Sequence, residues 1–421
     1  MASKRRQRAQ PAKPGRGWLA YLKALGPGII SGASDNDPTT VATMAVLGAS
    51  TVYGLSWLLV LVYVFLATIQ IISAQVGIVA KGGLQRAVRQ AFGKRWGYLL
   101  LGAVLAVNLV TIVADLEAGA AALSLLFGVD WRWFVLPFGL AMLLLLLFGS
   151  YRAISRVLEF ILLVFVAYVV SAFLARPDWG QVLRHTLIPH LSLRHAYIEG
   201  MLAMLGTTLT SYAYVWESIE EAEERLPIRE LGLARADAGF GTVFAVAIFW
   251  FILISTGATL GVNHQPVTTA AQAAQALEPA AGALASDIFA VGLLASAVLA
   301  VPVLAATTAY MLGEEFSWRS GLSEPVRRAR RFYLAVGGAI LIAVVVAFAG
   351  VSPIRLLFIS SIAGGIGTPI SLAFLLLVAR DQRVMRDHPI GPVLTAIGWA
   401  ATIVIGAISL YFIGHLLVRL V

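Results

Sequence analysis

The sequence predicts an all-α integral membrane protein of about eleven transmembrane helices, arranged as two inverted repeats of five helices in which helices 1 and 6 are broken. Hydrophobic residues make up 59% of the 421 positions and charged residues only 13%, a balance typical of proteins that cross a membrane many times. A hydrocarbon core of about 30 Å requires about 20 helical residues. Apolar segments that can span it are expected at residues 24–49, 53–79, 97–127, 133–149, 153–174, 197–220, 239–262, 284–312, 332–349, 355–379 and 391–418.

Polar runs interrupt two of these segments. The first is Gly32-Ala33-Ser34-Asp35-Asn36-Asp37-Pro38-Thr39-Thr40, and the second is Gly206-Thr207-Thr208-Leu209-Thr210-Ser211-Tyr212. The interrupted segments are numbers 1 and 6, which are equivalent positions in two five-helix repeats. Broken helices at such positions form the substrate and ion sites of many secondary transporters.

The basic residues sort by loop. The net charge is +9, and all but six of the 31 lysines and arginines lie in the N-terminal tail and in the even-numbered loops. The six exceptions are Arg132, Arg176, Arg184, Arg194, Arg355 and Arg419. This positive-inside pattern predicts a multi-pass protein of the cell (inner) membrane with a cytoplasmic N-terminus and an external C-terminus. The charge therefore indicates topology in a lipid bilayer, and no aromatic-interleaved basic patch points to nucleic acid.

The chain divides into a tail and one domain. Residues 1–17 are basic, contain Pro and Gly and lack periodicity, so we expect a disordered cytoplasmic tail. Residues 18–421 are expected to form a single transmembrane domain, and no cleavable signal peptide is recognisable. The absence of cysteine excludes disulfides, thiolate metal sites and cysteine nucleophiles. Nothing predicts an enzyme or a bound cofactor, and the oligomeric state is left open.

The first polar run offers oxygen ligands at bilayer depth. Asp35 and Asp37 flank Asn36, and Pro38 frees nearby carbonyl groups because it interrupts helical hydrogen bonding. A charge at the bilayer centre costs at least about 2.5–3.5 kcal/mol, so a compensating role such as binding a cation is expected. The alternative is that Asp35 or Asp37 caps the helix that follows, since Asp before Pro is a common helix start.

The second run contributes hydroxyl groups. Thr207 and Thr210 would share a helix face wherever the helix is intact, and either could bind a metal directly or through water. The alternative is structural, because Ser and Thr in membrane helices often hydrogen-bond a carbonyl one turn earlier.

Further acids occur at other positions in the apolar segments. Asp115 and Glu117 are two residues apart and cannot share a helix face, so we expect different roles for them, one in proton relay and one in an ion pair. A structural ion pair or a water-lined pocket is the alternative. Acidic residues at the ends of two segments are more consistent with solvated helix ends than with a strip of negative charge that concentrates cations at the mouth of a transport pathway. They are Glu217, Glu220, Glu221, Glu223 and Glu224, and then Glu314 and Glu315.

These motifs together resemble those of the NRAMP family of divalent-metal transporters, over nearly the whole chain. Gly26-Pro27-Gly28 and Asp37-Pro38-Thr39-Thr40-Val41-Ala42-Thr43 are similar to the family's GPG and DPGNxAT motifs. Met204-Leu205-Gly206-Thr207-Thr208-Leu209-Thr210-Ser211-Tyr212 is similar to its MIGAxxMPH motif. The resemblance implies a LeuT-type fold and assigns the metal-binding aspartate to Asp37.

The departures from the family motifs concern the ligands. Thr40 stands where the family has an asparagine ligand, Thr210 where it has a methionine, and Tyr212 where it has a histidine associated with proton coupling. Asp115 matches the first acid of the DxxE pair, but Ala118 replaces the second, and Glu117 is one place out of register. In segment 10, Ser361 stands at the place of a polar coordinating residue, eight residues before Pro369.

The resemblance is closest to the NRAMP-related magnesium-transporter branch. A site without the soft thioether contains only oxygen donors, which suit Mg²⁺. We therefore expect a secondary transporter that takes up Mg²⁺, and also Mn²⁺, by alternating access and without proton coupling. The expected metal site contains Asp37, Asp35, Asn36, Thr40, Thr207 and Thr210, with Asp115, Glu117, Tyr212 and Ser361 in proton-relay or supporting roles.

Three alternatives remain. A proton-coupled Mn²⁺ or Fe²⁺ symporter of the NRAMP type would require Asp115 or Glu117 to titrate. An intramembrane aspartyl protease would require acidic motifs on two helices, one typically Gly-x-Gly-Asp, which the chain lacks. A sensor would bind the ion without transporting it.

Overall fold

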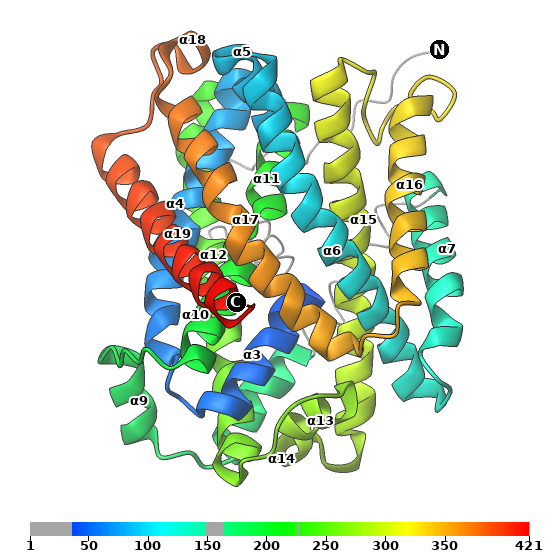
Figure 1. Cartoon of the computed structure of the whole chain (residues 1–421), viewed down its shortest axis with the longest axis vertical. Helices are drawn as coiled ribbons and strands as arrows, with labels where there is room; N and C mark the ends of the chain where they lie inside the picture. Colours follow the sequence, from blue (N-terminus) through cyan, green and yellow to red (C-terminus); the bar gives the residue numbers. More distant parts are fainter. Residues whose placement is uncertain (1–35, 149–163, 225–226, 421) are drawn as a thin grey trace, which may run out of the picture.

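The computed structural model describes residues 36–148, 164–224 and 227–420, and every regular element in these ranges is a helix. Figure 1 shows an upright bundle with short helices at both ends. Within the described ranges, seven helices are long and apolar enough to cross a membrane, and shorter apolar helices accompany them. The predicted all-α membrane fold is confirmed.

The principal helices follow the predicted segments. They are α3 (Pro38–Thr51), α4 (Ser56–Ala80), α6 (Lys94–Phe127), α7 (Arg132–Phe148), α10 (His195–Thr208), α11 (Ser211–Glu224), α12 (Leu231–Thr259), α15 (Ala285–Phe316), α16 (Arg330–Ala347), α17 (Pro353–Arg380) and α19 (Pro392–Leu420). Residues 164–174 form an apolar helix that represents the end of predicted segment 5. The predicted tail at 1–17, Asp35 and the beginnings of segments 1 and 5 lie outside the described residues.

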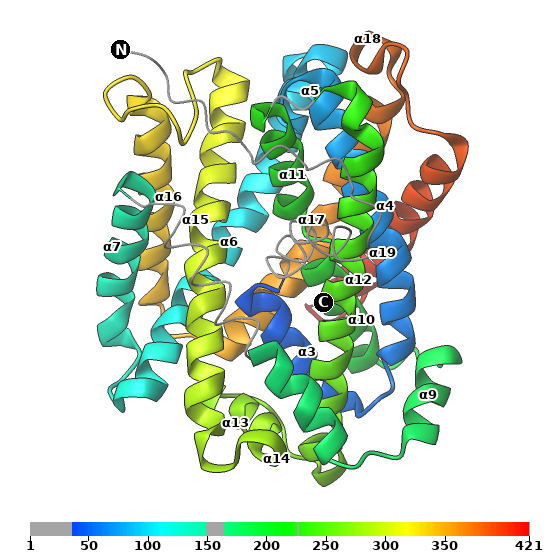
Figure 2. The ribbon, with the colours of Figure 1, turned by 180° about the vertical axis from the view of Figure 1, so that it is seen from behind.

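Segment 6 is broken where the sequence predicted. Helix α10 ends at Thr208 and α11 begins at Ser211, and the two meet at mid-height in the bundle (Figure 2). Thr207 and Thr210 were expected to share a helix face only where the helix is intact, and it is not intact here, because Thr210 lies in the break. The hydroxyl of Thr368 on α17 donates to the carbonyl oxygen of Leu209 at 3.2 Å. The neighbouring helix therefore satisfies a carbonyl that the break has freed.

Close packing holds α10 against α17. A Cβ atom added to Gly206 would lie 2.0 Å from the carbonyl oxygen of Ser361 and 2.2 Å from the amide nitrogen of Gly365. Only glycine permits this approach of the two backbones, which resembles the small-residue packing of membrane helices. The contact fixes the position of the end of α10.

The two ends of the bundle differ in charge. One end carries α5 (Leu84–Phe92), α18 (Gln382–Met385) and the α15–α16 connection, and the opposite end carries α9 (Trp179–Leu187), α13 (Ala270–Ala274) and α14 (Glu278–Ala281) (Figure 1). The basic loops of the described ranges lie at the first end, as the loop-by-loop sorting of lysine and arginine predicted. The first end is called the basic end below. Short 3-10 helices complete the connections at Ile228–Glu230, Gly261–Asn263, Gln275–Leu277 and Gly282–Leu284.

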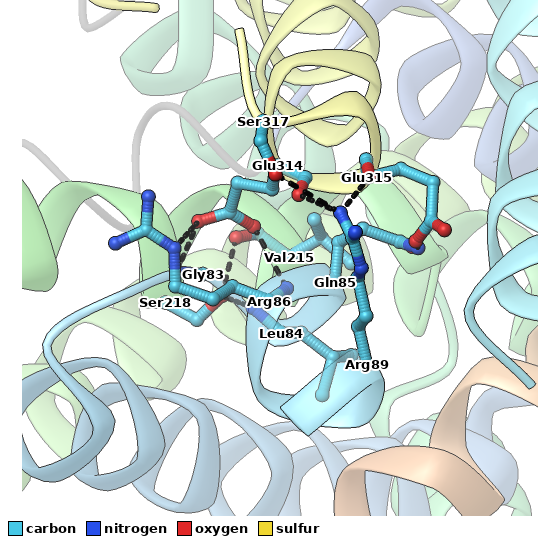
Figure 3. Close-up of polar contacts among 10 residues, drawn as sticks. All are labelled: Gly83, Leu84, Gln85, Arg86, Arg89, Val215, Ser218, Glu314, Glu315 and Ser317. Carbon is cyan, nitrogen blue, oxygen red and sulfur yellow. Dashed lines mark hydrogen bonds and ion pairs between the residues drawn. The ribbon is translucent and has the colours of Figure 1, made fainter. Parts of the chain in front are cut away.

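The predicted solvated helix end at Glu314 and Glu315 is wrong. Glu315 is only 2% exposed, and Gln85 donates to its carboxylate at 2.7 Å. Glu314 accepts from the backbone N–H of Gly83 at 2.7 Å and of Arg86 at 3.1 Å (Figure 3). Both acids attach α15 to α5. Glu314 satisfies free N–H groups at the start of α5, and Glu315 accepts from the side chain of Gln85.

Candidate functional site

The candidate site begins at Asp37, which is 2% exposed and caps α3. One carboxylate oxygen accepts from the backbone N–H of Thr40 at 2.7 Å. The other accepts from the hydroxyl of Tyr212, the second residue of α11, at 2.8 Å. The capping interpretation is confirmed for Asp37, and the two hydrogen bonds also fix the orientation of its carboxylate beside the helix break.

Thr40 and Thr207 connect the two interrupted segments. Their hydroxyl oxygens are 2.9 Å apart, and both side chains are buried. The predicted meeting of these residues is therefore present. Thr208, by contrast, donates to the carbonyl oxygen of Met204 at 2.7 Å, which is the structural role that the sequence left open for such residues.

Thr210 lies in the break itself, and Ser211 is the first residue of α11. The carbonyl oxygen of Thr210 accepts from the N–H of Ala213 at 3.3 Å, so its backbone begins α11. Both residues are buried, and the hydroxyl of Ser211 has no hydrogen-bond partner within the described part of the chain. These buried hydroxyls provide further oxygen atoms at the break.

Asn36 is also buried, with 1% of its surface exposed. Its carbonyl oxygen accepts from the hydroxyl of Ser296 on α15. A carbonyl just before Pro38 was expected to become available, and Ser296 occupies it here.

Asp115 and Glu117 behave differently, as their spacing predicts. One carboxylate oxygen of Asp115 accepts from the hydroxyl of Thr39 at 2.7 Å. Its second oxygen, and the Oε2 atom of Glu117, have no hydrogen-bond partner in the described ranges. Both residues are almost completely buried. Asp115 is therefore hydrogen-bonded to α3 through the hydroxyl of Thr39. Among the described residues, no hydrogen bond connects Glu117 to α3.

Ser361 does not contact Asp37 through any hydrogen bond in these ranges. Its hydroxyl is 2.6 Å from that of Thr43 and 3.0 Å from the carbonyl oxygen of Leu357. It connects α17 to α3 and lies one helical turn beyond Thr39 and Thr40.

Sequence reasoning missed Thr39, Thr43 and Ser296. The signal for the first two was present, because Thr39, Thr40 and Thr43 are spaced to present hydroxyls around the first turns of one helix. Ser296 had no such signal, since only the packing of α15 brings it to Asn36. Among the described residues, Asn36, Asp37 and the first turns of α3 form hydrogen bonds to five helices: α6, α10, α11, α15 and α17.

The chemistry of the site is that of oxygen donors. Among the described residues, no group of three or more His, Asp or Glu side chains could hold a metal ion. A cation here would need the carboxylate of Asp37 together with hydroxyl oxygens, carbonyl oxygens and water. Such ligands suit hard cations.

Comparison with known proteins identifies the family. The sequence model described as "Natural resistance-associated macrophage protein-like" (Nramp) matches residues 28–415. The chain belongs to the Nramp family. It is 26% identical over 93% of its length to a protein named divalent metal cation transporter MntH from Caldanaerobacter subterraneus subsp. tengcongensis, of which it covers 93%. It is also 27% identical over 96% of its length to the MntH of Deinococcus radiodurans, of which it covers 92%.

Solved structures support the fold of this Nramp protein. The Eremococcus coleocola manganese transporter superposes with a TM-score of 0.72 at 20% identity, over 95% of this chain and 88% of that one. Mhp1 in an inward-facing conformation superposes with a TM-score of 0.60 at 15% identity, over 92% of this chain and 90% of that one. The predicted LeuT-type arrangement of two five-helix inverted repeats is confirmed.

The Nramp motif positions are occupied by residues that contact one another. The hydroxyl of Thr40 is hydrogen-bonded to that of Thr207, and the hydroxyl of Tyr212 donates to Asp37. These four residues therefore belong to one buried network.

Proposed function

We propose that this Nramp protein is a secondary transporter that moves divalent metal cations by alternating access, and that it is not an enzyme. The observation that carries the proposal is the buried carboxylate of Asp37, positioned between the start of α3 and the break in segment 6. Helix ends and breaks at mid-bundle provide ion sites in transporters of this architecture. The names of the relatives, divalent metal cation transporter, agree with it.

Asp37 is the proposed main ligand. Asp35, Asn36, Thr40, Thr207 and Thr210 would contribute oxygen atoms directly or through water. Tyr212 already donates to one oxygen of Asp37, so a cation would bind the remaining lone pairs or replace that hydrogen bond. A partly hydrated ion needs few protein ligands, which fits a described site without a group of three or more acidic or histidine side chains.

Mg²⁺ is the proposed first substrate and Mn²⁺ the second, and the chain would then be related to the magnesium-transporter branch of the family. Thr210 offers a hydroxyl where a methionine sulfur would favour transition metals. Mg²⁺ requires octahedral oxygen ligands at about 2.0–2.1 Å and retains several waters.

The proposed direction is uptake into the cytoplasm across the cell (inner) membrane. The basic end of the bundle would face the cytoplasm, with the N-terminus on the same side and the C-terminus outside. Residues 1–17 would form a disordered tail, and residues 18–421 one transmembrane domain.

A proton-coupled Mn²⁺ or Fe²⁺ symporter is a second candidate, favoured by one observation. The hydroxyl of Thr39, on the helix that Asp37 caps, donates to Asp115. Binding of a metal at Asp37 can therefore change the surroundings of a second buried carboxylate through a single hydrogen bond. The absence of a second acid at Ala118 favours transport without proton coupling.

Transport assays in liposomes distinguish the candidates. The purified chain is reconstituted with a pH dye inside, and Mg²⁺ and Mn²⁺ influx are measured in parallel. Mg²⁺ entry without acidification is the expected result. Mn²⁺ entry with acidification and no Mg²⁺ flux would establish the symporter, and binding without flux would indicate a sensor.

The variant Asp37→Asn tests the ligand assignment. Asparagine is as good a helix cap as aspartate, so α3 should remain intact while the charge is lost. We expect uptake to be abolished. The matched control is Asp178→Asn, because Asp178 caps α9 at the opposite end through the N–H groups of Gly180 and Gln181. Asp37→Asn with normal uptake, or an equal loss in Asp178→Asn, would contradict the assignment.

A further inference from the structure

Two neighbouring cavities open at the basic end, around the connection between α15 and α16. One has a volume of about 470 Å³ and is lined by Arg86, Arg89, Gln90, Glu314, Ser317 and Trp318. The other, of about 360 Å³, is lined by Phe316, Ser317, Trp318, Arg319, Arg328, Ala329, Arg330 and Arg331. We refer to the second as the arginine cavity. The two share Ser317 and Trp318.

The arginines of the first cavity already have partners. Arg89 donates to the carbonyl oxygens of Glu314 and Glu315 and to the hydroxyl of Ser317, at the end of α15 (Figure 3). Arg86 forms an ion pair with Glu314 at 3.9 Å. These guanidinium groups complete the α5–α15 contact and have little capacity for a further anion.

The arginines of the arginine cavity are different. Arg319, Arg328, Arg330 and Arg331 are exposed, and within the described residues none of their side chains forms an ion pair or a hydrogen bond. Arg331 lies over the ring of Trp318, 5.8 Å from its centroid. Among the described residues that line the cavity, none is acidic. Four arginines therefore line one hollow without an acidic partner among these residues, which favours an anion.

The backbone adds to this preference. Helix α16 begins at Arg330, and its N-cap residue, Ala329, has no side chain that could accept from the first turn. Ala329, Arg330 and Arg331 all line the cavity. The free N–H groups and positive dipole end of an 18-residue helix therefore point toward the same hollow.

Exposed apolar side chains beside the arginine cavity indicate a lipid rather than a free anion. Phe316 stacks on Trp318 with ring centroids 5.3 Å apart and contacts Tyr98 at 6.2 Å, and Phe316 and Tyr98 are 45% and 49% exposed. Aromatic side chains concentrate at the headgroup level of membranes.

An apolar face of α16 continues from the cavity. Leu334 lies one turn beyond Arg330, and Leu341 and Val345 follow it on the same side of the helix. All three are more than 60% exposed, at 65%, 63% and 65%. The face provides a surface for acyl chains below a headgroup that occupies the cavity.

We propose that the arginine cavity binds the phosphate headgroup of an anionic phospholipid. The phosphate would contact Arg328, Arg330 and the first turn of α16, and the acyl chains would lie along Leu334, Leu341 and Val345. Basic pockets between membrane helices suit such headgroups. The inference is independent of which metal the protein transports.

Native mass spectrometry of the purified full chain in detergent tests the proposal. Phosphatidylglycerol and phosphatidylethanolamine with identical acyl chains are titrated separately. We expect phosphatidylglycerol to bind about tenfold more tightly. The variant Arg328→Gln with Arg330→Gln should lower that affinity about tenfold or more, because each arginine near an anionic surface contributes roughly fivefold. If the double variant does not purify as a folded protein, Arg328→Gln alone should lower it about fivefold.

The matched control is Arg327→Gln with Arg386→Gln, which removes the same charge from exposed positions at the basic end that do not line the arginine cavity. It should change the affinity less than about twofold. Equal binding of both lipids, or an equal loss in the control, would overturn the proposal. Displacement of the lipid by millimolar inorganic phosphate would also overturn it, because the site would then recognise a free anion.

Discussion

At the scale of single residues, the position of one carboxylate is set by two hydrogen bonds from different helices. Thr40 donates from the backbone of α3, and Tyr212 donates from α11 across the break. A hydrogen bond to a charged group contributes about 1.5–3 kcal/mol. The two donors therefore hold Asp37 in one orientation before a cation arrives, which reduces the cost of binding.

Replacing Tyr212 with phenylalanine tests this positioning. Loss of the hydroxyl frees one oxygen of Asp37, and we expect uptake at low metal concentration to fall about tenfold. Initial rates of metal influx into liposomes measure the effect. Tyr214→Phe is the matched control, because Tyr214 is a buried residue of the same helix whose hydroxyl lies 2.5 Å from that of Ser371. Equal losses in the two variants would show that any buried hydroxyl of α11 has this effect.

Thr210→Met tests the selectivity of the site. A thioether in the break adds a soft ligand, so we expect the ratio of Mn²⁺ to Mg²⁺ uptake to rise severalfold. Each 1.4 kcal/mol of difference between the binding free energies of the two ions would raise this ratio about tenfold. Competition between the two ions in the liposome assay measures this ratio. Thr210→Leu introduces a similar volume without sulfur and should not raise it. A rise with leucine would assign the effect to size rather than to ligand softness.

The sequence predicted which residues form the site, but it did not predict all of the hydrogen bonds between them. Asp37, Thr40, Thr207 and Tyr212 stand in two polar runs inside apolar segments, and the structure brings them together. That Asp115 bonds Thr39 depends on how α6 is rotated against α3, which no local pattern encodes.

At the scale of elements, the long helices were predictable because a membrane requires a minimum apolar length. The break in segment 6 was visible as a polar run, and α10 and α11 confirm it. Helix α9 was not predicted, because nine residues with a polar face fall below that length. The burial of Glu314 was not predicted, because the sequence does not show whether an acid at a helix end is solvated or accepts hydrogen bonds from the start of a neighbouring helix.

Gly206→Ala tests the contact between α10 and α17. The added methyl group would overlap backbone atoms of Ser361 and Gly365, so the helices must separate. We expect the free energy of unfolding to fall by about 1–3 kcal/mol, with lower uptake because the break moves. Thermal unfolding in detergent measures the change. The control is Gly338→Ala on α16, where the space is open and alanine should stabilise the helix by roughly 0.5–1 kcal/mol. Similar melting temperatures for the two variants would contradict the argument.

At the scale of the whole molecule, the separation of charge along the bundle connects the fold to the membrane. The basic end carries the connections around α5, α18 and α16, and the opposite end carries α9, α13 and α14. Because anionic lipid and the rules of insertion favour positive loops on the cytoplasmic side, we expect the basic end to face the cytoplasm.

The proposed orientation can be measured directly, because the natural chain contains no cysteine and a single introduced thiol reports one position. Ser323→Cys lies in the α15–α16 connection at the basic end, and Gln265→Cys lies before α13 at the opposite end, both at exposed positions. We expect a membrane-impermeant maleimide to label Gln265→Cys on intact cells and Ser323→Cys only after permeabilisation. The cysteine-free chain is the control for background labelling. The reverse pattern would place the basic end outside, and uptake through the Asp37 site would then have to run from the other side of the bundle.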